Sequence, residues 1–174
     1  PVAQRLIEIA GSGEAPVAHL HFKELHFAHA NYAFGPDALN TTYNGLGSTL
    51  GPNIVPGAFL ADGWQQSRIE GCTFSQLAGY AVELRFHCSE VTLTHNEMTV
   101  LGAGGVVIGK DLTTTNHSNV IDNNWIHDGG TLFPGTIPIR LGRACNKSVT
   151  HNEVSDFYLS GISAGDSLNY DAST

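Results

Sequence analysis

Pairs of large apolar residues recur along the chain, and the two members of each pair are five residues apart. The pairs are Phe22 with Phe27, Ile69 with Phe74, Leu93 with Met98, Ile121 with Ile126, and Val149 with Val154. Successive pairs begin 47, 24, 28 and 28 residues after the one before. A nearly fixed period with one long insertion is typical of a solenoid, in which stacked coils share a continuous core.

A second, shorter apolar segment follows each of the later pairs and predicts a second strand in each coil. These segments are Tyr80–Leu84, Gly105–Ile108, Ile137–Leu141 and Gly161–Ala164. Near the start of the chain, Val17–Ala30 alternates with the period of a strand, at Leu20 and Phe22 and then at Leu25 and Phe27. No helical segment lies between the strands. The pattern therefore predicts an all-β, single-stranded parallel β-helix of about five coils, and it fits a leucine-rich repeat poorly.

Residues 31–66 interrupt the period and contain four turn or breaker pairs, such as Gly35-Pro36 and Asn44-Gly45. A loop of this length is usually functional or forms a partner surface. A chain of 174 residues fits one domain. We therefore predict one β-helix domain over residues 1–174 with a loop insertion at 31–66. No capping repeat is evident after Gly165, so a fragment of a longer solenoid is an alternative.

A polar column is expected at the bend between the two members of each apolar pair. Its members are Cys72, Asn96, Asn124 and Asn152. Asparagine tolerates a left-handed backbone at such a bend, and stacked asparagines can hydrogen-bond to one another. We predict a structural asparagine ladder of Asn96, Asn124 and Asn152. By the same counting, Cys88 and Cys145 are expected to share a column two coils apart, as small buried side chains.

Composition narrows the classes of function. The net charge is −8, with 8 Lys and Arg against 16 Asp and Glu. Nucleic acid is therefore not an expected partner, because phosphate binding needs a basic surface. No apolar run is long enough for a membrane span. The chain begins at Pro1 without a methionine, so we expect that a leader or an upstream region has been removed.

Two aspartates are candidates for catalysis. Asp128 and Asp156 each follow the first apolar anchor of their coil by seven residues. Neighbouring coils would place them one rung apart, at about 5 Å, which is the carboxylate spacing of a retaining glycosidase. Asp166, which follows a second strand near Arg143, is a third candidate on the same face. The alternatives are turn carboxylates that cap backbone amides, or a pair that binds a cation such as Ca²⁺.

Several further side chains are candidates for binding a sugar. Trp125 and Tyr158 have the aromatic faces that sugars stack on. The polar candidates are His127, Arg140, Arg143 and His151. A lyase that uses Asp128, Asp156, Ca²⁺ and either arginine is a variant of this hypothesis. The alternative is that these side chains cover the outer face and bind no ligand. No ligand spacing predicts a metal site, and no other cofactor is expected.

Three motifs carry a family resemblance. They are G-A-G-G-V-V-I-G at Gly102–Gly109, N-N-W-I-H-D-G-G at Asn123–Gly130, and H-N-E-V-S-D-F-Y-L-S-G-I-S-A-G at His151–Gly165. The chain resembles bacterial right-handed parallel β-helix proteins and is most similar to the branch related to glycoside hydrolase family 141. The resemblance implies a right-handed coil and a secreted or cell-surface protein that binds or cleaves complex polysaccharide.

Two hypotheses of different classes follow. The first is an extracellular carbohydrate-binding or carbohydrate-cleaving protein, a glycoside hydrolase or lyase if it is an enzyme. The second is a structural β-solenoid subunit that stacks end to end into a surface fibre or adhesin. Uncapped coils expose strand edges that can pair with another copy, and head-to-tail contacts build open filaments.

Overall fold

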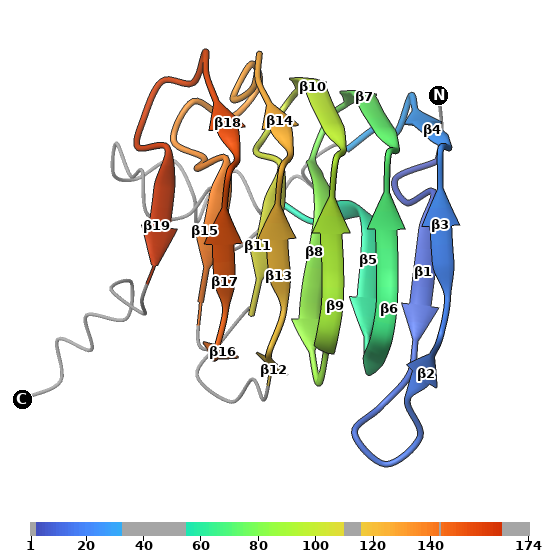
Figure 1. The fold of residues 1–174 in the computed structure, drawn as a ribbon. Helices are drawn as coiled ribbons and strands as arrows, with labels where there is room; N and C mark the ends of the chain where they lie inside the picture. The colour runs from blue at the N-terminus through green and yellow to red at the C-terminus, as the bar shows by residue number, and fades with distance from the viewer. Residues whose placement is uncertain (1–2, 33–54, 110–115, 143, 165–174) are drawn as a thin grey trace, which may run out of the picture.

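The computed structural model describes residues 3–32, 55–109, 116–142 and 144–164. These residues form strands in three parallel sheets and contain no helix (Figure 1). The all-β, parallel part of the fold prediction is thereby confirmed.

Each sheet takes its strands in chain order. Sheet A contains β1 (Ile7–Ala10), β5 (Gly57–Asp62), β8 (Tyr80–Phe86), β11 (Val106–Ile108), β15 (Ile139–Leu141) and β19 (Ile162–Ala164). Sheet B contains β2 (Val17–Ala18), β3 (His21–Lys23), β6 (Trp64–Glu70), β9 (Ser89–Thr94), β12 (Asn116–His117), β13 (Val120–Asp122), β16 (Ala144–Cys145) and β17 (Ser148–Thr150). Sheet C contains β4 (His26–Ala28), β7 (Thr73–Leu77), β10 (Glu97–Leu101), β14 (Trp125–Ile126) and β18 (Glu153–Val154).

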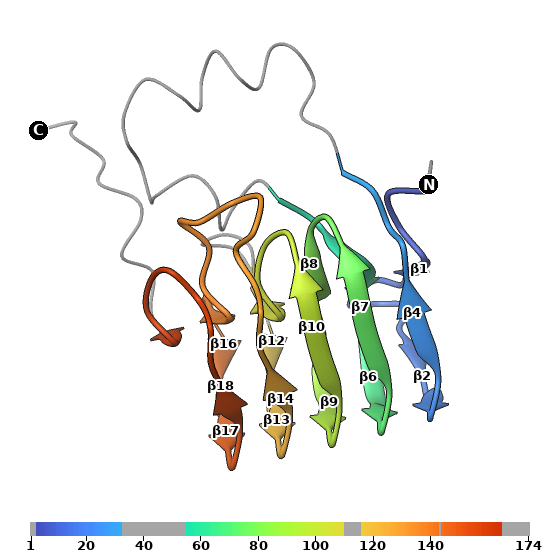
Figure 2. The ribbon, with the colours of Figure 1, turned by 90° about the horizontal axis from the view of Figure 1, so that it is seen from above.

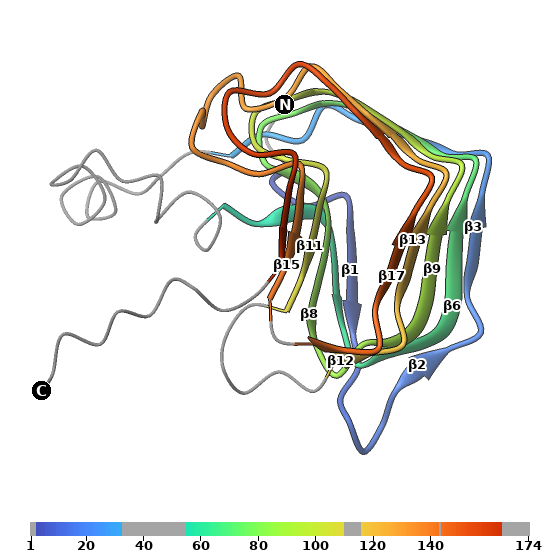
Figure 3. The same ribbon diagram turned by 60° about the vertical axis from the view of Figure 1, so that its left-hand side comes forward.

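The chain visits sheets A, B and C in turn and then returns to sheet A, and we call one such circuit a coil. Figure 3 shows the coils nearly superimposed, with sheet A facing sheet B across the interior. Figure 2 shows the strands of sheets B and C continuing into one another and stacking side by side from coil to coil. The predicted second strands of the later coils are β8, β11, β15 and β19 of sheet A.

The predicted apolar pairs line the interior. Strand register places Phe22, Ile69, Leu93, Ile121 and Val149 in one column of sheet B. In the middle coils Ile69, Leu93 and Ile121 are all 0% exposed. The second members of the pairs form a matching column in sheet C. The prediction that both columns point inward is confirmed for these coils, and their burial is the main source of stability.

Residues 33–54 of the predicted insertion lie outside the described residues. The end of that insertion, however, is strand rather than loop, because β5 spans Gly57–Asp62 and β6 begins at Trp64. The segment Ala58–Ala61 is buried on both faces, with Leu60 only 1% exposed. A strand that is buried on both faces shows no alternation, so its periodicity could not distinguish it from a loop with apolar residues.

Left-handed backbone conformations mark three bends of every coil. His19, Gln66, Glu90, Ser118 and Asn146 form the first column of bends; Glu24, Gly71, His95, Asn123 and His151 form the second; His29, Gln76, Val100, Asp128 and Asp156 form the third. Their φ angles lie between 44° and 65°. Within a coil, successive bends are five residues apart, which is why the apolar anchors are also five apart.

The asparagine column lies one residue after the second column of bends. The left-handed residue is Asn123 and not Asn124, so the expected backbone reason for these asparagines is wrong. Their side chains instead point inward and bond to the next coil. Asn96 Nδ2 donates to Asn124 Oδ1 at 2.9 Å, and Asn124 Nδ2 donates to Asn152 Oδ1 at 2.9 Å. The same amide nitrogens also donate to interior carbonyls, those of Ile69 and Leu93.

The cysteine column prediction needs a correction by one residue. Cys88 precedes β9, and its backbone N–H donates to Asn116 Oδ1 at 2.7 Å. Cys145 lies in register with His117 and hence with Ser89. Because adjacent strand residues point to opposite faces, Cys88 is buried whereas Cys145 is exposed. Burial also raises the pKa of the Cys88 thiol to about 12.

Candidate functional site

The outward side chains of sheet C, together with the third column of bends, form a surface that we call the sheet C face. Strand register aligns Thr73, Glu97, Trp125 and Glu153 in one outward column. Ser75 and Thr99 begin a second outward column, which His127 extends just after β14. Because side chains alternate along a strand, this face is the reverse of the buried column that contains Met98 and Ile126.

Trp125 and His127 form the centre of the sheet C face. Their rings are stacked, with centroids 3.9 Å apart and an interplanar angle of 23°. Trp125 is 46% exposed, while the side chain of His127 is only 11% exposed. A large aromatic ring is therefore held against a second ring and still presents much of its area to solvent.

Two carboxylates and a hydroxyl hold His127 in place. Its Nδ1 lies 2.8 Å from Asp128 Oδ2 and 3.3 Å from Thr99 Oγ1, and its Nε2 lies 3.4 Å from Glu97 Oε1. These partners come from two adjacent coils: Glu97 and Thr99 lie on β10, and Asp128 lies at the bend after β14. The Trp125 ring rests on His127, so its orientation depends on contacts between coils as well as on the local sequence.

The next coil continues the face toward Tyr158. Gly129 and Gly130 follow Asp128, and a Cβ at Gly129 would overlap the Phe157 ring. A Cβ at Gly130 would lie 3.4 Å from Tyr158 Cδ2, and Gly130 has a φ of 70°. The glycine pair therefore provides the space in which these two aromatic rings lie. Tyr158 is 72% exposed.

The aspartates predicted as a catalytic pair occupy equivalent positions in adjacent coils. Asp128 and Asp156 are both exposed and both left-handed, with φ of 52° and 59°. The Gly129 N–H donates to the backbone carbonyl of Asp156 at 3.3 Å, so the two bends are neighbours. Neither side chain enters the core. This geometry is also what turn carboxylates would show, since aspartate is favoured in left-handed turns.

Other predicted site residues lie elsewhere. Arg140 is on the outer side of sheet A, in register with buried Val107, and is only 6% exposed. His151 lies at the bend between sheets B and C. Asp166 and Arg143 are outside the described residues. The structure thus brings His127 into contact with both Trp125 and Asp128, whereas Arg140 lies on another sheet.

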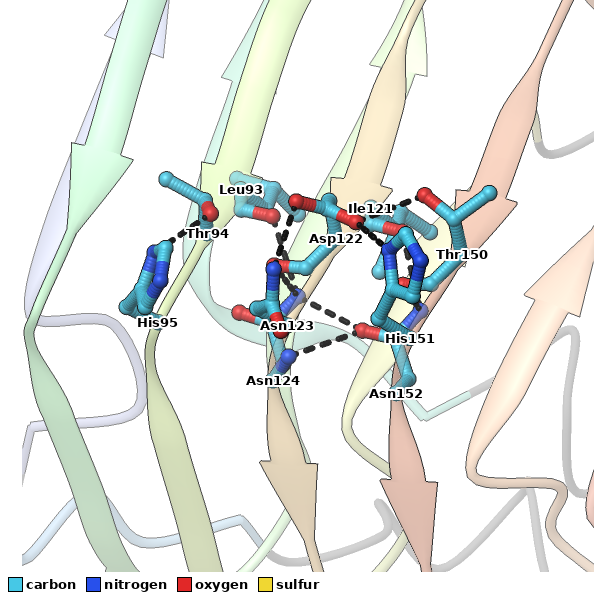
Figure 4. Close-up of polar contacts among 10 residues, drawn as sticks. All are labelled: Leu93, Thr94, His95, Ile121, Asp122, Asn123, Asn124, Thr150, His151 and Asn152. Atoms are coloured by element: carbon cyan, nitrogen blue, oxygen red, sulfur yellow. Dashed lines mark hydrogen bonds and ion pairs between the residues drawn. The ribbon is translucent and has the colours of Figure 1, made fainter.

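One strongly bonded carboxylate, Asp122, was not predicted. Its Oδ1 accepts a hydrogen bond from Thr150 Oγ1 at 2.6 Å and lies 2.8 Å from His151 Nδ1, and Asn123 Nδ2 donates to its Oδ2 at 2.9 Å (Figure 4). The Thr150 hydroxyl, followed by His151 and Asn123, lowers the pKa of Asp122 to about 2. The available sequence signal was the 28-residue spacing of Asp122 and Thr150, which equals the spacing of the apolar pairs in these two coils and places the two residues in register.

The outer surface of sheet B carries charges of both signs. Glu70 Oε2 lies 2.9 Å from Arg68 Nε and 3.2 Å from His21 Nε2, and Glu70 Oε1 lies 3.8 Å from Lys23 Nζ. A shallow depression of about 400 Å³ lies beside them, lined by residues that include His19, Arg68 and Glu90. On the same surface Gln66 Nε2 donates to Glu90 Oε2 at 3.3 Å.

In the part of the chain that the structure describes, no three His, Cys, Asp or Glu side chains are grouped to hold a metal ion. Over the same residues, no helix is long and apolar enough to cross a membrane.

Comparisons with known proteins support the fold. No protein-family model matches the sequence, and no curated protein matches it. A solved structure named "Glycoside hydrolase" is similar, with a TM-score of 0.77 and 18% sequence identity. The match covers 95% of this chain and 34% of that chain, so the present chain spans about a third of its length. At this identity the likeness shows a shared parallel β architecture.

Proposed function

We propose that this protein binds polysaccharide on the sheet C face, as a single right-handed parallel β-helix that acts outside the cell. The observation that carries the proposal is the exposed Trp125 ring stacked on a His127 that carboxylates hold in place. Aromatic faces stack on the apolar faces of sugars, and carboxylates accept hydrogen bonds from hydroxyl groups. The similarity to a protein named as a glycoside hydrolase supports the same class of ligand.

The repeating geometry of the face suits a polymer better than a single small molecule. Equivalent positions recur at about 4.8 Å from coil to coil, which is the spacing of adjacent strands. Trp125 lies on β14, and Tyr158 follows β18 in the next coil. A ligand that contacted both rings would therefore run along the stack of coils.

We further propose that Asp128 and Asp156 cleave the bound chain. The support is their position on adjacent coils, since carboxylates about 5–5.5 Å apart are typical of retaining glycosidases. One carboxylate would attack the anomeric carbon while the other protonates the leaving oxygen. Water, deprotonated by the second group, would then release the sugar from the first.

Binding is tested by comparing the wild-type protein with Trp125→Ala on a panel of soluble polysaccharides. We expect roughly fivefold or greater weakening of binding, because an aromatic ring that a ligand covers contributes more than about 1 kcal/mol. Leu25→Ala is the matched control, since Leu25 is also 46% exposed but lies at the bend before β4. Equal binding by Trp125→Ala would contradict the proposed site.

Long filaments without any glycan binding would favour a fibre subunit instead.

Cleavage is tested separately by release of reducing ends, with and without added Ca²⁺. Asp128→Asn and Asp156→Asn should each abolish release, and binding should persist in Asp156→Asn, which leaves the contacts of His127 intact. If the wild-type protein binds the glycan but releases no reducing ends, the protein is a binding module and the catalytic proposal fails.

A further inference from the structure

The sheet C face is acidic. Its described residues include the carboxylates of Glu97, Asp128, Glu153 and Asp156 and no lysine or arginine. The described lysines and arginines belong to segments of the other two sheets. These are Arg5, Lys23, Arg68, Arg85, Arg140 and Lys147.

Two of these four carboxylates have no side-chain partner on the face. Glu97 and Asp128 both contact His127. Glu153 and Asp156 are exposed, and their carboxylates have no hydrogen bond or ion pair with any other described residue. By contrast, Glu70 on sheet B is within 4 Å of three cationic or ionisable nitrogens. An uncompensated carboxylate beside a binding platform favours a ligand with positive charge.

The position of the carboxylates relative to the tryptophan strengthens this argument. Register places Glu97 on the rung before Trp125 and Glu153 on the rung after it. Adjacent rungs are about 4.8 Å apart, so a carboxylate flanks the indole on either side. An ammonium group over an indole face is attracted by the ring, and the carboxylates can accept its hydrogen bonds.

We propose that the polysaccharide bound on the sheet C face carries free amino groups, with the ammonium held between the Trp125 ring and the carboxylates of Glu97 and Glu153. This inference rests on the proposed binding of glycan at Trp125. It also disfavours uronic acid polymers, because their carboxylates would approach a face of the same sign with no lysine or arginine among its described residues.

The test compares three soluble probes by calorimetry: linear glucosamine oligomers, their N-acetylated counterparts and oligogalacturonate. N-acetylation removes the charge and keeps the sugar ring. We expect the glucosamine oligomers to bind roughly tenfold more tightly than the N-acetylated ones. The preference should weaken between about 0.01 M and about 0.15 M ionic strength, as the screening length falls from about 30 Å to about 8 Å.

Glu153→Gln removes one charge and preserves the shape of the side chain. It should weaken binding of the glucosamine oligomers by roughly three- to fivefold and leave the N-acetylated oligomers unaffected. Glu14→Gln is the matched control, because Glu14 is exposed in the turn before β2 and makes the same change in net charge. An equal effect of the two variants would show that only net charge matters and would overturn the proposal.

The remaining outcomes separate this inference from the proposed function. Equal or tighter binding of the N-acetylated oligomers or of oligogalacturonate, lost in Trp125→Ala, would leave the glycan site standing and overturn the amino-group inference. Absence of binding by every oligomer and by every polysaccharide of the panel would overturn both.

Discussion

The outer surfaces of sheets B and C are built from the same coils and differ in how their polar side chains are satisfied. On sheet B, Glu70 is surrounded by Arg68, His21 and Lys23, and Asp122 accepts hydrogen bonds from neighbouring side chains. On sheet C, the side-chain carboxylates of Glu153 and Asp156 have no hydrogen bond or ion pair with any other described residue. The two surfaces meet at the second column of bends.

This difference is the reason why we place the proposed binding site on sheet C and not on sheet B. In a stacked solenoid every outward residue has a neighbour on the rung above and below, so a face can satisfy itself by alternating donors with acceptors. Sheet B does so. Sheet C instead places Trp125 between Glu97 and Glu153, and neither glutamate can pair with the other. A surface left with exposed aromatic area and unpaired charge is better suited to binding than to stability.

The largest expected effect, on the free energy of unfolding, comes from removing the hydrogen bonds of Asn124, which lies at the bend between sheets B and C. The Asn124 side chain donates to Asn152 Oδ1 and to the backbone carbonyls of Leu93 and Asp122, and it accepts from Asn96; these bonds are buried or partly buried. Asn124→Ala should lower the free energy of unfolding by about 3 kcal/mol, because several buried partners lose their hydrogen bonds together. Chemical denaturation measures this change.

The control for that variant is the preceding residue. Asn123→Gly replaces an exposed side chain at a left-handed position that glycine adopts readily. Its free energy of unfolding should change by less than about 0.5 kcal/mol. Similar losses in the two variants would mean that the inward hydrogen bonds of Asn124 are not what stabilises the bend.

A substitution in the third column of bends tests whether backbone strain is stored at the end of sheet C. Val100 is a β-branched residue with a φ of 52° and is 49% exposed. Val100→Asn should raise the free energy of unfolding by about 1 kcal/mol, because asparagine tolerates this conformation and little apolar burial is lost. The same change at Val120, in strand β13 of sheet B, should be destabilising. Destabilisation at both sites would contradict this prediction.

Acid titration tests whether hydrogen bonds on sheet B lower the pKa of Asp122. Because the folded protein lowers the pKa of Asp122 to about 2, from about 3.9 in an unfolded chain, the ionised form stabilises the fold. That contribution is present above about pH 4 and is lost as the pH falls through about 2. Carboxyl NMR of Thr150→Val should show a higher midpoint for Asp122, whereas Thr99→Val should not. An unchanged midpoint in Thr150→Val would exclude its hydroxyl as the main cause.

The smallest expected effect is on the ion pairs of sheet B. Glu70→Gln should lower the free energy of unfolding by less than about 1 kcal/mol, since exposed ion pairs contribute little. The loss should shrink further at high salt. Glycan binding should be unchanged, because Glu70 lies outside the sheet C face. A large loss of binding in this variant would place the ligand on sheet B instead.

The elements that repeat were predictable from the sequence, and those that do not were harder. Five-residue spacing predicted the inward columns of Ile69, Leu93 and Ile121, because a buried position has a strict preference for apolar residues. The end of the 31–66 segment was missed because β5 is buried on both faces. The left-handed residue was misplaced by one, since Asn123 and Asn124 are the same residue type in different roles.

The candidate site was predicted in part for a similar reason. Trp125, His127 and Asp128 are near one another in sequence, so their proximity follows from the local strand and bend. Glu97 was not among the predicted site residues, and it reaches His127 only across coils. Arg140 was assigned to the same group and lies instead on sheet A, because counting along the chain does not show toward which side of a coil a strand faces.

By itself, the sequence determined the period, the interior columns and the all-β parallel architecture, because hydrophobic burial acts on every coil in the same way and leaves a repeated signal. Only the tertiary structure decided which outward side chains meet. Those contacts depend on the register of strands that are 24 to 47 residues apart, and a change of one residue in register moves a side chain to the opposite face.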